Sequence, residues 1–264
     1  MSHARLTALT ALMLTALAPA PARAQSPAER LARADSLHDA LKPNEELAEL
    51  RAILETAPND AQVLWRVARA QVDLAKLIRG EHEYTRNVRD SVYQVARAYA
   101  ERAVAADSTE AEAHFVVSLA LGQLSLTRSG KERVRFARTI YDEAARALAL
   151  DSTHDGAHHV LGAWHAEIKR LSGVTRFFAK TLLGAGFMDR ADWDSAAAHL
   201  ERAVALNPTY IHHRLELAEI YVDRERWAEA RTQLEAIPGL PDRDVLDGDH
   251  RQAAAASLEK IRNR

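Results

Sequence analysis

Small and large apolar residues recur at a fixed spacing near the C-terminal end of this chain. Ala196 and Ala230 lie 34 positions apart, and so do Leu200 and Leu234. A unit of this length holds two helices, neither of which can bury its apolar face alone. Small residues at fixed points let neighbouring helices approach, and large residues fill the space between them. The chain is therefore expected to stack one helix pair on another.

A period of 34 residues is that of the tetratricopeptide repeat. The positions inside the unit agree with it, because small, turn and large residues fall where the repeat needs them: Ala203, Pro208, Leu217, Ala218 and Tyr221. Only 10 Gly and 8 Pro occur among 264 residues, and the abundant Ala, Leu, Glu and Arg are good helix formers. The sequence predicts an all-α protein, a tetratricopeptide-like helical-repeat superhelix.

Four short segments combine turn residues with a helix start: residues 57–60, 107–110, 151–154 and 207–210. Pro fixes φ in such a link, and Asp, Ser, Thr or Asn there can cap the next helix. Successive links begin 50, 44 and 56 residues apart, which is more than one repeat. We expect the surplus in long connections between the two helices of a pair, around residues 77–90, 125–133 and 169–190.

The links divide the chain into about five helix pairs plus a C-terminal capping helix. The expected pairs are residues 28–41 with 45–56, 61–78 with 91–106, 111–124 with 131–150, 156–171 with 192–206, and 211–224 with 227–236. Residues 242–263 are expected to cap the array, because a terminal repeat needs a polar outer face.

The first 24 residues have the pattern of a secretory signal peptide. Arg5 gives a positive start, residues 6–18 form a short apolar run, and Ala22-Arg23-Ala24 offers a small-x-small cleavage site. The run is shorter than the ~20 apolar residues of a membrane-spanning helix. We expect cleavage after Ala24, a mature helical-repeat domain at 25–264 and a periplasmic or secreted protein. The alternative is an uncleaved N-terminal anchor.

Composition excludes several classes of function. The chain has no cysteine, so it has no disulfide, thiol nucleophile or cysteine-based zinc site. Loss of Arg5 and Arg23 with the signal would take the formal charge from −2 to −4. Such a small acidic excess gives no electrostatic footprint for nucleic acid or anionic lipid. We expect no nucleic-acid partner, and no membrane contact beyond the alternative anchor.

Catalytic motifs are missing from the sequence. It contains no Gly-rich phosphate loop, no HExxH and no GxSxG elbow. The carboxylates stand on helix faces with Arg or Lys three or four residues away, which is typical of solvated surfaces. The sequence therefore predicts no catalytic residues, no enzyme activity and no cofactor.

Twelve histidines make a metal site worth testing, and six of them are concentrated in the central and later repeats: His154, His158, His159, His165, His212 and His213. His158 and His165 are separated by ~10 Å of helical rise, too far to share an ion. A site would need His159 to meet His212 or His213 across stacked repeats. We favour imidazoles that cap helices or hydrogen-bond between them. A metal-binding periplasmic protein is one alternative function.

Residues 157–185 read AHHVLGAWHAEIKRLSGVTRFFAKTLLGA, and residues 203–221 read AVALNPTYIHHRLELAEIY. This combination resembles the regulator of microtubule dynamics family and its bacterial tetratricopeptide relatives. The resemblance covers residues 156–264 well and the N-terminal half only through helix spacing. It implies an all-helical repeat protein without known catalytic residues. Animal members are microtubule-associated, but this chain departs from them by its export signal, so we expect no microtubule binding.

The resembling segment contains an inserted amphipathic helix. Its apolar residues recur at helical spacing, with Arg176 and Lys180 on the other side. We expect Phe177, Phe178 and Leu182 to be buried against the fourth helix pair. The alternative is a membrane-peripheral protein that uses the amphipathic 174–187 helix.

The first helix of each pair in such an array usually lines the concave surface. Aligning each first helix to its link places these candidate partner-binding residues there: Trp65, Arg69, Phe115, His159, Glu167 and Glu219. We expect Trp65, Arg69 and Glu219 to be at least partly exposed toward one concavity. For Trp65 and Phe115, packing between helices is an equal alternative. The predicted function is a non-enzymatic exported scaffold that binds a protein or peptide on its concave face.

Overall fold

The computed structural model describes residues 26–128 and 130–264, and every regular element in that part of the chain is a helix. The segment predicted to be a signal peptide lies outside the described residues. The elements are α1 (Pro27–Asp39), α2 (Pro43–Leu54), α3 (Ala61–Leu77), α4 (Glu83–Ala106), α5 (Ala111–Ser125), α6 (Gly130–Leu150), α7 (Asp155–Arg170), α8 (Gly173–Leu183), the 3-10 helix η1 (Gly186–Arg190), α9 (Trp193–Leu206), α10 (Ile211–Asp223), α11 (Trp227–Glu235) and α12 (Asp247–Lys260).

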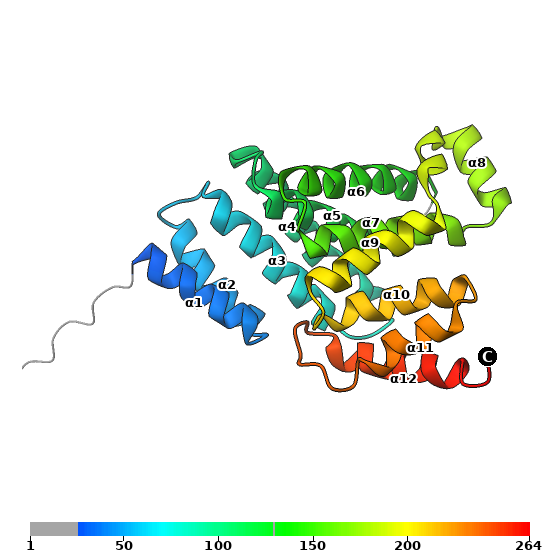
Figure 1. The fold of residues 1–264 in the computed structure, drawn as a ribbon. Helices are drawn as coiled ribbons and strands as arrows, with labels where there is room; N and C mark the ends of the chain where they lie inside the picture. Colours follow the sequence, from blue (N-terminus) through cyan, green and yellow to red (C-terminus); the bar gives the residue numbers. More distant parts are fainter. Residues whose placement is uncertain (1–25, 129) are drawn as a thin grey trace, which may run out of the picture.

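The helices pair as the sequence predicts. α1 packs on α2, α3 on α4, α5 on α6, α7 on α9 and α10 on α11, and α12 lies against α10 and α11. Figure 1 shows α1 and α2 at one side of the array, α10 to α12 together near the C-terminus, and α8 standing out at the edge. The predicted tetratricopeptide-like superhelix of five pairs with a C-terminal capping helix is confirmed.

Turn chemistry at the links starts each new first helix. Asp60 caps α3 by accepting hydrogen bonds from two backbone N–H groups. At the next two links, Asp107 and Asp151 accept from the backbone N–H of Thr109 and Thr153, each at 2.8 Å. These are Asx turns, in which the side chain holds its own backbone two residues on. The two links therefore repeat one geometry.

The surplus residues between links lie mostly in longer helices, which corrects the prediction of long connections. α4 begins at Glu83 rather than at residue 91 and has 24 residues, and α6 has 21. Residues 83–90 contain no Gly or Pro, so nothing interrupts helical hydrogen bonding through them. Only the third surplus, after α7, forms a separate insertion, which consists of α8 and η1.

The capping helix also begins later than predicted, at Asp247 instead of residue 242. The Asp247 carboxylate accepts from the backbone N–H groups of Arg243 and Asp244 at 2.6 and 2.8 Å. These bonds hold the chain before α12 in a turn. In a helix that began at residue 242, the first backbone N–H groups would have no partner within the helix. Here the Asp247 carboxylate accepts from two of them instead.

Small residues bring neighbouring helices together, as the repeat spacing predicts. Ala196, Ala203 and Ala230 are fully buried. In α7, a Cβ placed on Gly162 would lie 2.7 Å from Cγ of Leu200 and 3.0 Å from the carbonyl oxygen of Ala196. The absence of a side chain at Gly162 therefore allows α7 to approach α9 closely. α9 is the second helix of this pair and follows the inserted α8 and η1 in the sequence.

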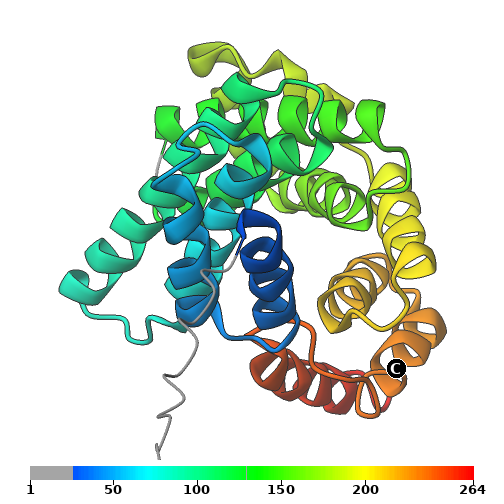
Figure 2. The ribbon, with the colours of Figure 1, turned by 90° about the vertical axis from the view of Figure 1, so that its left-hand side faces the viewer.

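The superhelix curves until its C-terminal part meets α3. In Figure 2, α12 in red comes back toward the N-terminal helices in blue. Lys76 Nζ lies 2.6 Å from Oδ2 of Asp244, and the Tyr210 hydroxyl donates to the same oxygen at 2.8 Å. Burial opposes the charge of Lys76, but Asp73 and Asp244 outweigh it and raise the pKa of this ammonium well above its usual value. Arg79 forms a second ion pair, with Asp249 of α12.

Candidate binding groove

The inner face of the array carries a groove of about 1180 Å³. Its walls come from the first helices α3, α5, α7 and α10, from α6 and α8, and from the segment before α12. One part of the lining is apolar and includes Leu119, Ile140, Trp164, Ile168 and Leu183. Another part is polar and includes His159, His213, Glu216, Arg243 and Asp244. A concave, largely apolar site with a few polar groups is typical of ligand-binding surfaces.

Four of the six predicted partner-binding residues line this groove: Arg69, Phe115, His159 and Glu167. Ala163 lies between His159 and Glu167 on one face of α7 and also lines it. The alignment of helices to their links therefore placed the inward face of α7 correctly. Phe115 also packs against His154 at the start of α7, because the centres of the two rings lie 4.6 Å apart. Phe115 thus packs on a neighbouring helix start and also lines the groove, and partner binding by this residue stays a prediction.

Trp65 is buried, contrary to the prediction that it faces the concavity. It is only 5% exposed and packs with Leu64, Ala103 and Ala113, between α3, α4 and α5. The small Ala113 at the start of α5 leaves room for the indole ring. The guanidinium groups of Arg66 and Arg69 cover the ring at 4.1 and 5.0 Å from its centre. Trp65 is therefore a core residue of the second repeat.

Arg69 lines the groove but is held in an ion network. Its Nη2 lies 3.0 Å from Oε1 of Glu46, a fully buried carboxylate of α2. The other oxygen of Glu46 has no hydrogen-bond partner in the described part of the chain, and His38 Nδ1 lies 3.4 Å away from it. The Arg69 charge thus compensates a buried carboxylate, which gives this residue a structural role that the sequence did not indicate.

Glu219 is not among the groove-lining residues, and belongs to an acidic cluster at the groove's edge. Arg170 of α7 stands at the centre of four carboxylates: Glu167 at 2.7 Å, Asp223 at 2.8 Å, Glu216 at 3.3 Å and Glu219 at 3.7 Å. Burial, and then the neighbouring charge of Glu219, raise the pKa of Glu216 to about 7. The alignment of helices to their links selected Glu219 on α10 and did not select Glu216, which lies three positions earlier on the same helix.

The central histidines bind one another and the backbone. His159 and His213 meet with Nδ1 atoms 3.0 Å apart, His213 Nε2 lies 3.0 Å from Asp155 Oδ2, and the His154 ring nitrogen caps α7. The repeat-equivalent His114 and His158 contact the carbonyls of Ser108 and Ser152, six residues earlier in each case. In residues 26–128 and 130–264, no group of three or more His, Asp or Glu side chains is placed to hold a metal ion.

Burial changes the acid–base behaviour of these groups. It lowers the pKa of His159 well below its usual value and that of His212 to about 3, with neighbouring imidazoles adding to the effect. Burial lowers the pKa of His199 to about 4. Burial opposes the ionisation of Asp155, but hydrogen bonds from His213 and Asn207 outweigh it and lower the pKa of this carboxyl to about 2. At neutral pH the groove wall thus holds the neutral imidazoles of His159 and His212 and the ionised carboxylate of Asp155.

The inserted helix α8 exposes its apolar side chains, so the prediction that they are buried is wrong. Phe177 is 63% exposed, Phe178 54% and Leu182 71%, and Val174 is also exposed. Ala179 is the buried residue of this helix. α8 packs on α6 and η1 rather than under the fourth helix pair. These contacts cover only the side of α8 that carries Ala179. Phe178 and Leu182 instead line the groove.

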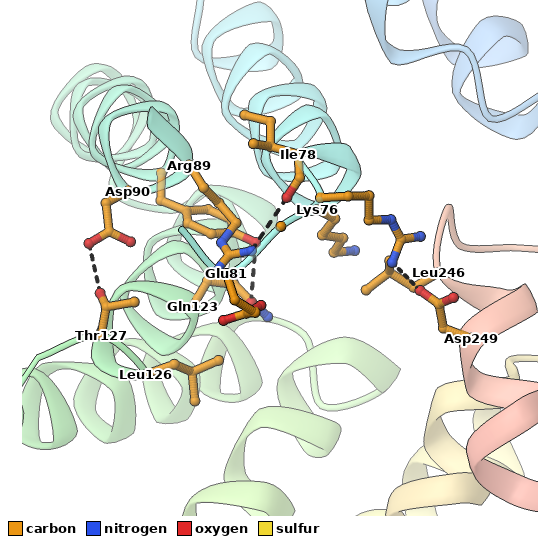
Figure 3. A pocket seen from close by; sticks show the side chains of 13 residues that line it. Lys76, Ile78, Glu81, Arg89, Asp90, Gln123, Leu126, Thr127, Leu246 and Asp249 are labelled. Carbon is orange, nitrogen blue, oxygen red and sulfur yellow. Dashed lines mark hydrogen bonds and ion pairs between the residues drawn. The ribbon is translucent and has the colours of Figure 1, made fainter. Parts of the chain in front are cut away.

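A second, smaller pocket of about 270 Å³ lies where α3 ends, and Lys76 lines both it and the groove. Figure 3 shows Arg89 and Asp90 from α4 on one side and Leu246 and Asp249 on the other. Asp90 accepts from Thr127 at 2.7 Å, which fixes the turn after α5. The pocket lies beside the contact that joins α3 to the C-terminal segment.

The sequence alone could not indicate the part of the groove that comes from α6 and from the segment before α12. α6 is the second helix of its pair, a position that the alignment did not place on the concave surface. Residues 243–246 follow the last helix pair and reach the groove through the curvature of the array. Within the described residues, none of the helices is both long and apolar enough to cross a membrane.

Fold and groove together define a tetratricopeptide-like helical-repeat protein with a concave groove. Residues 30–262 match the family model described as Regulator of microtubule dynamics protein 1-3, and the chain belongs to this family. Regulator of microtubule dynamics protein 1 of Bos taurus is 24% identical over 185 residues, which cover 66% of this chain and 57% of the bovine protein. The Mus musculus protein is 25% identical over 231 residues, which cover 87% of this chain and 73% of the mouse protein. The chain thus spans little more than half of the bovine relative.

Solved structures support the fold. A thermophilic TPR protein of Thermus thermophilus matches with a TM-score of 0.63 and 21% identity, over 89% of this chain and 100% of that one. Pseudomonas aeruginosa PilF matches with a TM-score of 0.52 and 14% identity, over 89% and 91% of the two chains. These similarities confirm the tetratricopeptide-like fold.

Proposed function

We propose that this protein is a non-enzymatic interaction scaffold that holds a segment of a partner protein in its concave groove. The observation that carries the proposal is that the groove of about 1180 Å³ is continuous with exposed apolar side chains of α8. Soluble proteins rarely leave large apolar side chains clustered on the surface unless something binds there.

The size of the groove suits a helix or an extended peptide. A helix about 10 Å wide occupies roughly 420 Å³ per turn of 5.4 Å. The groove of about 1180 Å³ would then accommodate about three helical turns, or one side of a longer helix. Phe178 and Leu182 would contact the apolar side of this segment.

The membrane-peripheral alternative uses the same apolar side chains of α8. The polar side of α8 carries only two basic residues, Arg176 and Lys180, and Lys180 is paired with Asp189 at 2.7 Å. This is a small basic face for binding to anionic lipid. We therefore prefer a protein segment as the occupant. We also propose that the protein is exported, on the strength of its N-terminal sequence pattern. A mature chain that begins at Gln25 in a periplasmic or secreted fraction is the expected result.

Site-specific photocrosslinking tests the scaffold. The crosslinking residue p-benzoylphenylalanine replaces Phe178 at the groove or, as a control, Tyr84, which is exposed on α4 and lies outside the groove lining. We expect one defined protein to crosslink from position 178 in native cells, at a single peptide, and not from position 84. The same products from both positions would contradict the groove as the binding site. Lipid as the sole product at position 178 would favour the membrane alternative.

A further inference from the structure

The acidic cluster at the edge of the groove is only partly neutralised. Arg170 is the one lysine or arginine within 4.0 Å of Glu167, Glu216, Glu219 or Asp223 in the described part of the chain. With all four carboxylates ionised, these five side chains carry a net charge of −3. The surplus is negative, and no second lysine or arginine of the described residues lies within 4.0 Å to compensate it.

Two of these carboxylates open onto the groove. Glu167 and Glu216 both line it, and they come from neighbouring first helices, α7 and α10. Oε1 of Glu216 accepts the long hydrogen bond from Arg170 at 3.3 Å, and no hydrogen bond within the described residues reaches its Oε2. An acceptor of this kind, in a site partly removed from water, favours a charged donor.

The apolar lining begins next to these carboxylates. Glu167 lies four positions after Ala163 of α7 and four before Leu171, the residue that follows this helix, and all three line the groove. Ile168 follows Glu167 directly, and Phe178 of α8 lies in the same groove. A ligand that covers the apolar surface would therefore have its border near two carboxylates.

We propose that the occupant is an amphipathic helix of a partner protein that places a lysine or arginine, at the border of its apolar face, against Glu167 and Glu216. This inference rests on the proposed function. A cation there supplies the missing charge, and the apolar face covers Leu171, Phe178 and Leu182. A long cationic side chain also fits the geometry, since its methylene stem can lie on apolar surface while its head reaches the carboxylates.

Charge compensation makes binding depend on pH in a defined direction. The titratable and charged groups around Glu216 are Glu167 and Arg170 of α7, Glu219 of α10 itself, and, further along the cluster, Asp223 and His250. Because the pKa of Glu216 is about 7 in the free protein, a bound cation lowers it and binding releases a proton. Affinity for a cationic helix should therefore rise as pH rises through about 7.

A pair of synthetic peptides tests the proposal with the full chain. Both are fluorescein-labelled helices of about 18 residues, or five turns, with leucine along one face and alanine and glutamine elsewhere. One carries a lysine beside the leucine face, and the other carries norleucine there, which keeps the stem and removes the charge. Fluorescence anisotropy at pH 8 and pH 6 gives the dissociation constants.

The lysine peptide is expected to bind about tenfold more tightly than the norleucine peptide at pH 8, and to lose most of that advantage at pH 6. Glu216→Gln should abolish both the preference and its pH dependence. Glu101→Gln is the matched control, because Glu101 is also paired with an arginine, Arg97, but lies exposed on α4 away from the groove. Glu219→Gln, which removes one unit of charge near an intact Glu216, should reduce the preference partly. Leu182→Ala should weaken both peptides.

Equal affinity for the two peptides, or a lysine preference that survives Glu216→Gln, would overturn the cation site and leave the groove as a binding site. Failure of both peptides to bind would count against this proposal and the proposed function together. Thermal unfolding of each variant shows whether the fold is kept, and Glu219→Gln still decides the outcome if Glu216→Gln does not fold.

Discussion

Replacing Gly162 with alanine measures how closely α7 and α9 are packed across the inserted segment. The new Cβ would lie 2.7 Å from Leu200 Cγ and 3.0 Å from the Ala196 carbonyl oxygen. Leu200 is fully buried, and the carbonyl belongs to the backbone of α9, so relief requires that the helix move. Overpacking of this kind costs ~1–3 kcal/mol. Alanine in place of glycine within a helix returns ~0.5–1 kcal/mol. The net loss is therefore centred on ~1 kcal/mol and reaches at most ~2.5 kcal/mol.

Gly122→Ala is the matched control for this experiment. Gly122 lies in α5, and a Cβ there would meet no atom within 4 Å. Only the helix-propensity term remains, so the variant should be more stable than the native protein by ~0.5–1 kcal/mol. The same chemical change is thus expected to act in opposite directions at two helical glycines.

Urea unfolding of the purified protein, followed by circular dichroism, gives both values. The midpoint should fall for Gly162→Ala and rise for Gly122→Ala with an unchanged slope. In thermal unfolding, each kcal/mol corresponds to a shift of about 2–4 °C for a chain of this size. If Gly162→Ala unfolds at the same urea concentration as the native protein, or at a higher one, the close approach of α7 and α9 is refuted.

Three further outcomes follow from the groove and its surroundings. Arg69→Ala should lower the free energy of unfolding by about 3 kcal/mol, because it leaves the buried Glu46 without its cation. Urea unfolding measures this loss. An unchanged free energy of unfolding would show that Glu46 does not need Arg69 and that His38 alone compensates it. Because the fold keeps His159, His199 and His212 neutral, the unfolded chain binds more protons, so stability should fall as pH drops from about 6.5 toward 3; a urea midpoint that is equal at pH 7 and pH 4.5 would contradict this. Added zinc or nickel should not raise the unfolding temperature, because only a ligand of the native state does so, and a rise of several degrees that His159→Ala abolishes would restore the metal-binding alternative.

Local periodicity predicted the parts of the fold that depend on neighbouring repeats. The 34-residue spacing of Ala196 and Ala230 identified the repeat, and alignment to the links placed His159 and Glu167 on the groove. The same alignment wrongly placed Trp65 on the concave surface. The direction of a large apolar side chain depends on the size of the residue that it faces, and here the small Ala113 leaves room for the ring in the core.

Three other features could not be predicted from spacing alone. The apolar stripe of α8 indicates that something covers it, but not whether that cover belongs to the same chain. Asp244 and His250 reach the groove because the array curves back on itself, and this curvature is the sum of small rotations over all repeats. The acidic cluster around Arg170 combines side chains from two stacked helices, so no single segment of sequence contains it.

The ion pair between Lys76 and Asp244 has a consequence for how the chain folds. It joins residues 168 positions apart, whereas an open repeat array is held by contacts between neighbours and can lose its terminal repeats one at a time. A contact of this span forms only after the intervening helices are in place, since the long loop must be closed first. The C-terminal helices should therefore unfold together with α3 in one cooperative transition rather than fray independently.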